Sequence, residues 1–383
     1  MAQDVVIAGV GTTDFSKNSK RSEHQLAVEA IVACLDDAGI GASEIDGMIT
    51  FTMDETSEVD IRRELGCESL HHFSRVPFGG GGGCATVGHA AMAIRAGVAH
   101  SVVVYRALNT ASRVRFGSGQ LTPPPESGDQ RWFTNFGLAT PAARVGITAR
   151  RYLETYGLDD DAYAPFALTA RAYAVTNPAA YYYNRPLSRD EYLSSPWISR
   201  PLRRFDCCQE SDGAVALLVT TAERARDLRK KSAKILASAQ NAGLEQIGLA
   251  QYWCEDILKL PEVSGLKEQL RKQCGMAPRD ADAAMLYDHF TPLVALQLEQ
   301  LGFCQDGEAT EFAARGHLGV DGSMPMNTHG GHLGEAYLHG MTHIGEALRQ
   351  LRGEAVNQVS DVSAVFVASA ASTPGSALML GQL

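Results

Sequence analysis

The sequence predicts a layered α/β fold made of two related halves, and three observations indicate it. Short apolar segments rich in β-branched residues alternate with segments of helical periodicity, a pattern typical of helices packed on sheets. The segment GIGASEIDGMITF from Gly39 aligns without a gap with GMAPRDADAAMLY from Gly275. Two glycine-rich loops, 79–83 and 327–334, each precede an apolar helix and a strand. Only two copies exist, so the repetition indicates a duplicated unit and not a solenoid.

Hydrophobic patterning predicts the elements of the first half. In chain order these are a strand at 4–10, a helix at 23–37, a strand at 47–51, a helix around 90–96 and a strand at 101–105. Leu26, Ile31 and Leu35 give the first helix an apolar face, and Gly39 is expected to end it. The segment SVVVY at 101–105 is apolar throughout, so we expect a central strand buried on both faces.

The second half is expected to repeat this order. The alignment pairs Asp46 with Asp282 and Phe51 with Tyr287, and it is followed by a predicted helix at 344–351 and a strand at 363–368. We therefore divide the chain into an N-terminal half, 1–228, and a C-terminal half, 229–383. Within the first half, residues 108–200 are interpreted as a loop-rich insertion, and such insertions often form substrate clefts.

Composition excludes several classes of protein. The formal net charge of −10 argues against binding to nucleic acid, so a phosphate-bearing ligand would need a local basic patch. The eight cysteines are scattered without a CxxC pair, which favours a reducing cytoplasm. The N-terminus lacks the features of a signal peptide, and no apolar run reaches the roughly 20 residues of a membrane span. We expect a cytoplasmic protein without a membrane span.

Longer motifs point to a known family. They are FSKNSKRSE, GGGGGCATVGHAAMAI, VVVYRALN, FDCCQESDGAVA, LYDHFTP and NTHGGHLGEAYLHG. Together they resemble the lipid-transfer branch of the thiolase superfamily, and within it the bacterial steroid side-chain aldolases. The resemblance implies a thiolase-like layered αβαβα fold, a homodimer, and a CoA thioester substrate with no covalently bound cofactor. It also implies a small zinc-ribbon and OB-fold partner, which would hold the only zinc and complete a heterotetramer.

The sequence departs from a thiolase at both of that family's cysteines. A thiolase needs a nucleophilic cysteine at the start of the first buried helix, where the helix N-terminus favours the thiolate. Counting back by the family's spacing leads to Gly80, and Cys84 lies about one helical turn too late. The segment that matches the second thiolase cysteine, 369–372, contains none.

Tyrosines occupy the positions of two thiolase histidines. By resemblance, NTHGGHLGEAYLHG places Tyr337 at the histidine of the thiolase GHP motif, and LYDHF places Tyr287 at the histidine of an HDxF motif. Both substitutions occur in otherwise matching segments, so we interpret them as a paired change of chemistry.

These replacements suggest a retro-aldol cleavage. The reaction needs a base for the hydroxyl proton, a thioester that accepts the electrons as an enolate, and an acid for the new carbanion. By resemblance, Tyr287 would be the base and Tyr337 the acid, although the sequence does not settle which is which. A tyrosinate base would need its pKa lowered by about 3 units from ~10, and concerted proton transfer is the alternative.

The resemblance implies that the reaction converts a 17-hydroxy steroid 20-carboxyl-CoA into a 17-keto steroid and propionyl-CoA or a similar short acyl-CoA. The oxyanion is expected to contact backbone N–H groups of the glycine loops, whose candidates are Gly80, Gly81, Gly330 and Gly331. The steroid and the length of its side chain stay open, as does activity without the partner.

Other polar residues are candidates for supporting roles. Asp288, His289 and His339 are expected to lie beside the tyrosines and to tune them. His339 and His343 are four residues apart, but no third ligand accompanies them, so no metal site is expected. The candidates for CoA phosphate contacts are Arg106, Arg113 and Arg115, with Arg200, Arg203 and Arg204 as a second group.

Two other functions compete with the aldolase. A thiolase or acyltransferase would use Cys84 as its nucleophile. A carrier would bind an acyl-CoA or a sterol without changing it. The carrier has no need for two tyrosines in the histidine positions, and the thiolase would be inactivated by loss of Cys84.

Overall fold

A nine-stranded mixed sheet organises the chain. The computed structural model describes residues 3–113, 115, 118, 133, 135–244, 246, 249, 254–369, 371 and 373–383. The strands are β1 (Val5–Thr12), β2 (Gly47–Phe51), β3 (His72–Val76), β4 (Ser101–Asn109), β7 (Asp212–Thr221), β8 (Ala233–Asn241), β9 (Ala283–Met285), β10 (Ala364–Ser369) and β11 (Gly375–Gln382). Their order in the sheet is β3-β2-β4-β7-β1-β8-β11-β10-β9. The strands predicted from the sequence are confirmed, with shifts at their ends.

The duplication is visible in the strand order. The run β2-β4-β7-β1 from the first half has its counterpart in β9-β10-β11-β8 from the second. In both runs the first pair is parallel and the next two pairs are antiparallel. The two runs meet where β1 pairs with β8. The predicted fold of two duplicated halves is therefore confirmed.

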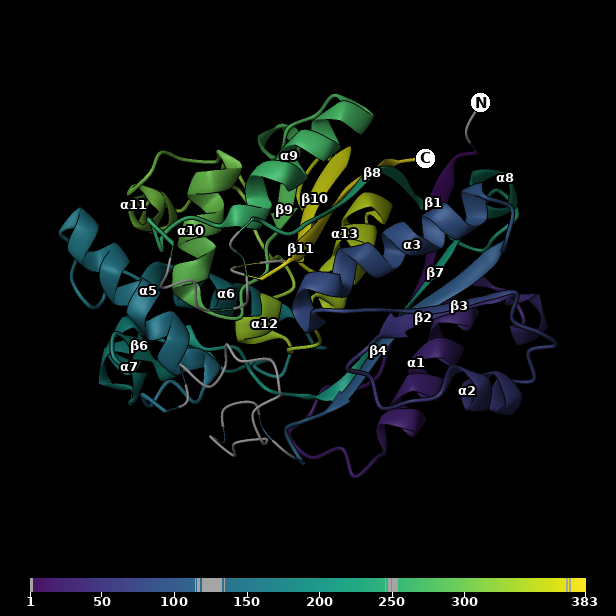
Figure 1. Cartoon of the computed structure of the whole chain (residues 1–383), viewed down its shortest axis with the longest axis horizontal. Coiled ribbons are helices and arrows are strands. Elements are labelled where there is room, and N and C mark those ends of the chain that lie inside the picture. The colour runs from purple at the N-terminus through teal and green to yellow at the C-terminus, as the bar shows by residue number, and fades with distance from the viewer. Residues whose placement is uncertain are drawn as a thin grey trace.

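Helices form three layers around the two parts of the sheet (Figure 1). α1 (Glu23–Ala38) packs on β1, β4 and β7, and α9 (Pro261–Cys274) packs on β8 and β11. Between them, α3 (Gly83–Arg95) and α13 (Met341–Arg352) contact strands of both halves. These two helices are buried along much of their length, as the apolar segments after each glycine loop predict. The layer order is the αβαβα arrangement expected from the sequence.

The paired aspartates of the internal repeat make the same contact in each half. Asp46 Oδ1 accepts hydrogen bonds from the backbone N–H groups of His100 and Ser101, both at 2.9 Å. Asp282 Oδ2 accepts from those of Ser363 at 2.8 Å and Ala364 at 2.9 Å. In each case the carboxylate precedes one strand and binds the start of the parallel strand beside it. The repeat thus extends to the hydrogen bonds that set strand register.

The insertion is more helical than the sequence predicted. Its described part contains α5 (Pro141–Tyr156), α6 (Ala164–Thr176), α7 (Arg189–Ser194) and a small hairpin of β5 (Trp197–Ser199) and β6 (Leu202–Arg203), while residues 119–132 lie outside the description. Burial of Val145, Tyr152 and Phe166 in the core of the second half gives the helices their stability. The prediction of a loop-rich segment was wrong here, because its many polar and aromatic residues concealed the helical periodicity.

The remaining helices are shorter or lie at the periphery. They are α2 (Glu58–Leu65), α8 (Ala222–Ala225), α10 (Thr291–Leu301), α11 (Ala309–Ala314) and α12 (Gly331–Gly334). The predicted boundary after residue 228 falls between α8 and β8, and the division into domains there stays a prediction. Among the described residues, every helix is too short or too polar to cross a bilayer.

Candidate active site

A cavity of about 730 Å³ lies where the two glycine loops approach each other. This volume is within the range of ligand pockets in proteins, roughly 300–1,000 Å³. Part of its lining is apolar, and the residues of this kind include Met53, Phe78, Ile198, Phe205, Leu249, Phe290 and Leu333. Another part is basic, with Lys17, Arg115 and Arg204. A large, partly apolar ligand with an anionic or polar end matches this lining.

Tyr287 and Tyr337 both line the cavity and contact each other. Tyr287 follows β9, and Tyr337 lies between α12 and α13. The Tyr287 hydroxyl donates a hydrogen bond to the Tyr337 hydroxyl at 2.9 Å, and the ring centroids are 6.3 Å apart. The structure therefore brings together the two residues that the sequence selected, although they are separated by 49 intervening positions.

Neither phenol is prepared to lose its proton. Burial raises the pKa of Tyr287 well above 10, and the neighbouring Tyr337 raises it further. Burial likewise raises the pKa of Tyr337, against the opposing effect of its hydrogen bond with Tyr287. A tyrosinate base would need the opposite shift. Of the two possibilities that the sequence left, this environment favours concerted proton transfer.

His339 is held by a buried arginine. Arg106 Nε donates to His339 Nδ1 at 3.2 Å, and Arg106 Nη1 pairs with Asp54 at 2.8 Å. Both side chains of this ion pair are almost fully buried. Burial, together with the positive charge of Arg106, holds the pKa of His339 well below its usual range, so the ring is neutral. His339 lines the cavity, with its ring 5.2 Å from that of Tyr337.

His289 occupies the corresponding place beside Tyr287. Its ring lies 4.8 Å from that of Tyr287, and its side chain lines the cavity. Burial lowers the pKa of His289 to about 4, so this imidazole is neutral at physiological pH. Each tyrosine is therefore followed, two positions later, by an uncharged histidine that faces the same cavity.

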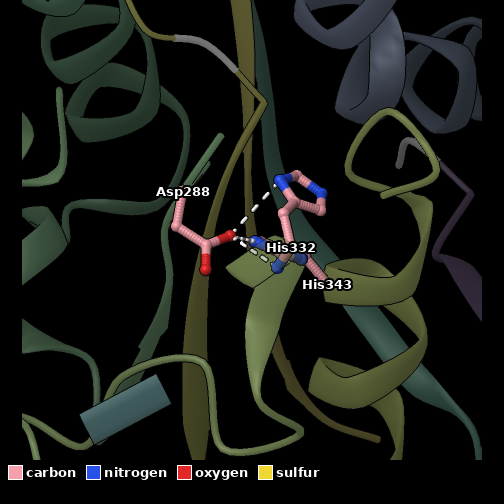
Figure 2. A group of neighbouring side chains, drawn as sticks. All are labelled: Asp288, His332 and His343. Carbon is pink, nitrogen blue, oxygen red and sulfur yellow. Dashed lines mark hydrogen bonds and ion pairs between the residues drawn. The ribbon is translucent and has the colours of Figure 1, made fainter. Parts of the chain in front are cut away.

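Asp288 forms a buried cluster with two histidines that the sequence did not single out together. Figure 2 shows its carboxylate facing His332 and His343, with Oδ1 at 3.2 Å from His332 Nδ1 and 3.1 Å from His343 Nε2. The three side chains have the donor types of a metal site. His343 Nε2 also lies 2.8 Å from the Leu286 carbonyl, an acceptor, so this nitrogen carries a proton. We therefore interpret the cluster as a hydrogen-bond network.

This network positions the tyrosines. His332 Nε2 accepts a hydrogen bond from the backbone N–H of Gly340 at 3.1 Å. The His332 ring meets Tyr287 and Tyr337 edge-on, with centroid distances of 4.6 Å and 5.1 Å. His332 thus packs against both phenols, whereas His343 faces Asp288 and does not converge with His339.

Two of the four candidate oxyanion donors in the glycine loops are engaged in backbone hydrogen bonds, and the other two glycines allow close packing. The Gly81 N–H donates to the Phe78 carbonyl, and the Gly330 N–H donates to the Asn327 carbonyl, so the expected role of these two groups as oxyanion donors is not supported. A Cβ on Gly80 would lie 1.7 Å from the Tyr287 hydroxyl oxygen. A Cβ on Gly331 would lie 2.0 Å from Asp288 Oδ2. These glycines admit the side chains that face them.

Cys84 is poorly placed for a nucleophile. It lies in the first turn of α3 with no solvent exposure, and its Sγ contacts the Val367 carbonyl at 3.6 Å. Burial raises the pKa of the Cys84 thiol to about 12. Its backbone N–H donates to Ser369 Oγ, in the segment that matches the second thiolase cysteine. The geometry argues against the thiolase alternative.

The arginine candidates separate into buried and exposed side chains. Arg106 is 1% exposed and committed to Asp54 and His339, so its suggested contact with a CoA phosphate is wrong. Arg113 is exposed and paired with Glu55. In the second group, Arg200 pairs with Asp160, Arg203 stacks on Trp197, and Arg204 lines the cavity.

Arg115 is the member of the first group that lines the cavity. Lys17 also lines the cavity, and it was not among the candidates predicted from the sequence. Lys17 Nζ donates to the Glu210 carbonyl at 2.5 Å, and burial lowers the pKa of this amine to about 8. Lys17 belongs to the FSKNSKRSE motif, which could have drawn attention to it.

Comparison with known proteins places the chain in a family. Residues 259–380 match the thiolase C-terminal domain-like family. A steroid side-chain-cleaving aldolase of Thermomonospora curvata is 48% identical over 379 residues, which cover 98% of this chain and 97% of the relative. The chain belongs to the steroid side-chain-cleaving aldolase family.

Two further similar proteins support this family assignment. A 17-hydroxy-3-oxo-4-pregnene-20-carboxyl-CoA lyase of Mycobacterium tuberculosis is 46% identical over 386 residues, covering 100% of both chains. The solved structure of an Ltp2-ChsH2(DUF35) aldolase superposes with a TM-score of 0.94 at 47% identity, and it covers 99% of this chain and 98% of that one. The family resemblance found in the motifs is thereby confirmed over the whole length.

Proposed function

We propose that this enzyme cleaves a carbon–carbon bond in a steroid side chain carried as a CoA thioester. The reaction is a retro-aldol cleavage of a 17-hydroxy steroid 20-carboxyl-CoA, and its products are a 17-keto steroid and propionyl-CoA or a similar short acyl-CoA. Family membership supports the class of reaction. The observation that carries the chemistry is the hydrogen bond between the Tyr287 and Tyr337 hydroxyls at the cavity wall.

The tyrosine pair acts as a proton relay. Tyr287 accepts the proton of the tertiary hydroxyl as it passes its own proton to Tyr337, and Tyr337 delivers a proton to the α carbon of the departing thioester enolate. The direction follows the observed hydrogen bond, in which Tyr287 donates to Tyr337. Because each phenol gains one proton as it loses another, no free phenolate forms. This agrees with the raised pKa values of both tyrosines.

The bonds and protons of this reaction balance without a further reactant. The O–H bond of the substrate and the bond between its β and α carbons break, and a C=O bond and a C–H bond form. The electron pair of the broken carbon–carbon bond passes to the thioester as an enolate and returns to the α carbon on protonation. No covalent enzyme intermediate is needed, which is consistent with the burial of Cys84.

The test is a set of phenylalanine variants. Tyr287→Phe and Tyr337→Phe are each expected to lower kcat by about 10²- to 10⁴-fold, since each removes a group that transfers a proton. The double variant is expected to lose little more than either single variant, because the relay needs both hydroxyls. Tyr183→Phe, at an exposed tyrosine outside the cavity lining, is the control.

Product formation would be followed by mass detection of the steroid ketone and the acyl-CoA. A loss below about tenfold in either single variant would reject the relay, since general acid–base catalysis contributes more than that. Binding of the thioester without any cleavage by the unaltered enzyme, with its partner present, would favour a carrier instead.

We also propose that two copies of the chain associate through β3. This strand is at one end of the sheet, so one of its edges has no neighbouring strand. On β3, Phe73 is 60% exposed, and His72 Nε2 and Ser74 Oγ are buried without a hydrogen-bond partner among the described residues. Exposed apolar side chains on an edge strand favour pairing with another chain. A second copy paired along this edge would cover the exposed Phe73 side chain.

The partner protein is a separate part of the proposal. The related Ltp2-ChsH2(DUF35) aldolase contains two named components, and this supports a small second subunit for the present chain. By family resemblance it is a zinc-ribbon and OB-fold protein that completes a heterotetramer and carries the only zinc. The cytoplasm is the proposed location, supported by eight cysteines that are all free thiols.

A further inference from the structure

The retro-aldol step places negative charge on the thioester oxygen, and two of the four glycine N–H groups expected to bind it are already engaged. The N–H groups of Gly81 and Gly330 already bind backbone carbonyls. Removing one donor from an oxyanion site typically lowers kcat by about 10²- to 10³-fold. A further donor for this charge is therefore sought among the side chains of the cavity.

We propose that His339 is a catalytic residue that donates a hydrogen bond from its Nε2–H to the thioester oxygen and stabilises the enolate. This inference rests on the proposed function for its chemistry. It depends on three observations: the direction of the bond from Arg106, the place of the imidazole at the cavity wall, and the constrained backbone of His339.

The bond from Arg106 fixes the position of the imidazole proton. A guanidinium can donate hydrogen bonds but cannot accept them. Its bond to Nδ1 therefore requires a lone pair at Nδ1, and a neutral ring then carries its proton on Nε2. Arg106 is itself held by Asp54 and by the carbonyls of Met53 and Ala107. The tautomer is thus set by a buried side chain that makes four hydrogen bonds.

The surroundings direct the Nε2 edge of the ring toward the site. A Cβ on Gly79 would lie 3.6 Å from His339 Nε2 and 3.5 Å from Cε1, so this edge meets the first glycine loop. His339 and Tyr337 both line the cavity with ring centroids 5.2 Å apart, so both can reach one thioester group. His339 also has a φ of 53°, a left-handed conformation uncommon in residues other than glycine. Such strain clusters at functional sites.

A neutral donor suits this step. The enolate is uncharged again once Tyr337 has delivered its proton, so a permanently charged group would bind the intermediate too strongly for the products to leave easily. Burial and the charge of Arg106 keep the pKa of His339 well below its usual range. The imidazole can therefore polarise the carbonyl without giving up its own proton to the enolate.

The test compares two substitutions of similar shape. Gln and Met are both unbranched and similar in length, so His339→Gln and His339→Met impose similar demands on the left-handed backbone, but Gln alone keeps an N–H donor. The Met variant is expected to lose about 10²- to 10³-fold in kcat, and the Gln variant about tenfold or less. Equal losses in the two variants would overturn the proposal, as would a Met variant with nearly full activity.

Infrared spectroscopy tests the hydrogen bond from His339 to the thioester carbonyl in the absence of turnover. The probe is a substrate analogue that lacks the tertiary hydroxyl and carries ¹³C at the thioester carbonyl, so it binds but cannot be cleaved. In the unaltered enzyme the infrared carbonyl band is expected at a lower frequency than in the Met variant, with the Gln variant between them. An unchanged band would refute the contact. Because the analogue is never cleaved, this result is independent of whether the retro-aldol assignment is right.

Arg106→Lys tests the origin of the tautomer. Lysine keeps a cation opposite Asp54 but lacks the Nε–H that binds His339. We expect the carbonyl band to move toward that of the Met variant, and kcat to fall. If the bound analogue shows the band of the unaltered enzyme, Arg106 does not act through His339.

Discussion

At the residue scale, the four side chains proposed to surround the reacting bond are uncharged, although the proposed reaction passes through an anion. Tyr287 and Tyr337 keep their protons because burial raises their pKa values, and His289 and His339 stay neutral because burial lowers theirs. The same physical cause, removal of water, acts in opposite directions on acids and bases. The groups beside the reacting bond therefore share one charge state over a wide range of pH.

This constancy predicts a flat pH profile for kcat. Between about pH 6 and pH 9 we expect less than a threefold change in kcat, because His289 becomes charged only near its pKa of about 4 and neither phenol ionises in this range. Lys17, with a pKa of about 8, does titrate in this range, and because it is expected to act in substrate binding its effect should be on KM. A free tyrosinate base would instead make kcat rise with pH toward the pKa of tyrosine. Initial rates at saturating substrate, with enzyme stability checked at each pH, distinguish the two outcomes.

Gly80 supplies a second prediction at this scale. In Gly80→Ala the new Cβ would lie 1.7 Å from the Tyr287 hydroxyl oxygen, so the phenol must leave its present position. We expect a loss of kcat comparable to that of Tyr287→Phe, about 10²-fold or more. Gly41→Ala is the matched control, since the nearest side-chain atom to its Cβ would be 3.6 Å away. Activity retained by Gly80→Ala would show that the phenol position is not critical.

At the scale of elements, each half repeats one hydrogen-bonded connection between parallel strands. Asp46 joins β2 to the start of β4, and Asp282 joins β9 to the start of β10. Burial alone would raise the pKa of both carboxyls, but the backbone hydrogen bonds, together with those from the His100 and Ser363 side chains, outweigh it and the pKa values are lowered. These bonds are therefore stronger in the ionised state.

Removing either carboxylate should destabilise the fold to a similar degree. We expect Asp46→Ala and Asp282→Ala each to lower the free energy of unfolding by about 1 kcal/mol, because exposed and partly buried backbone N–H groups lose a charged acceptor. Urea unfolding followed by circular dichroism measures this. A large effect in one half and none in the other would contradict the equivalence.

The pH dependence of this contribution has a definite sign. A carboxyl with a lowered pKa in the folded state binds fewer protons there than in the unfolded state. Its stabilisation is complete above about pH 4, the pKa of an unfolded aspartate, and is lost as the pH falls through the lower folded value. The alanine variants should therefore lose less stability than the unaltered enzyme on acidification below about pH 4.

The strands and turns that were predicted correctly are those whose sequence patterns lie within a few neighbouring residues. The segments around Phe51 and Tyr287 carry their periodicity within a few residues, so their strands and turns could be placed from the chain alone. The pairing of Arg106 with His339 joins residues 233 positions apart, and only packing of the two halves creates it. The contact of His332 with the two tyrosines also could not be predicted from the sequence. Nor could the raised pKa values of the tyrosines, because they depend on how completely the cavity wall excludes water.

At the scale of the whole molecule, charge is distributed unevenly. The chain has a formal net charge of −10, yet the cavity lining gathers Lys17, Arg115 and Arg204 with Glu210 as its acidic residue in the described part. Such a basic lining is what a phosphate-bearing substrate requires on an acidic protein. The need for a local basic patch could be predicted from composition, whereas its residues could not.

The edge strand β3 gives a prediction for assembly. Phe73→Glu would place like charges on the two copies at the proposed contact, and we expect the dimer dissociation constant to rise at least about tenfold, which corresponds to roughly 1.4 kcal/mol. Sedimentation velocity over a range of concentrations measures it. Val356→Glu, at a similarly exposed residue after α13, is the control. Unchanged association of Phe73→Glu would place the interface elsewhere.

The fixed position of Tyr337 has a stereochemical consequence. An enolate is planar, and a phenol anchored in the wall of the cavity can reach one side of that plane. If the reaction runs in heavy water, the phenol hydrogens exchange with solvent between turnovers, and a single deuterium is delivered to the acyl product. The labelled methylene carbon of propionyl-CoA should then be chiral, with one handedness in large excess.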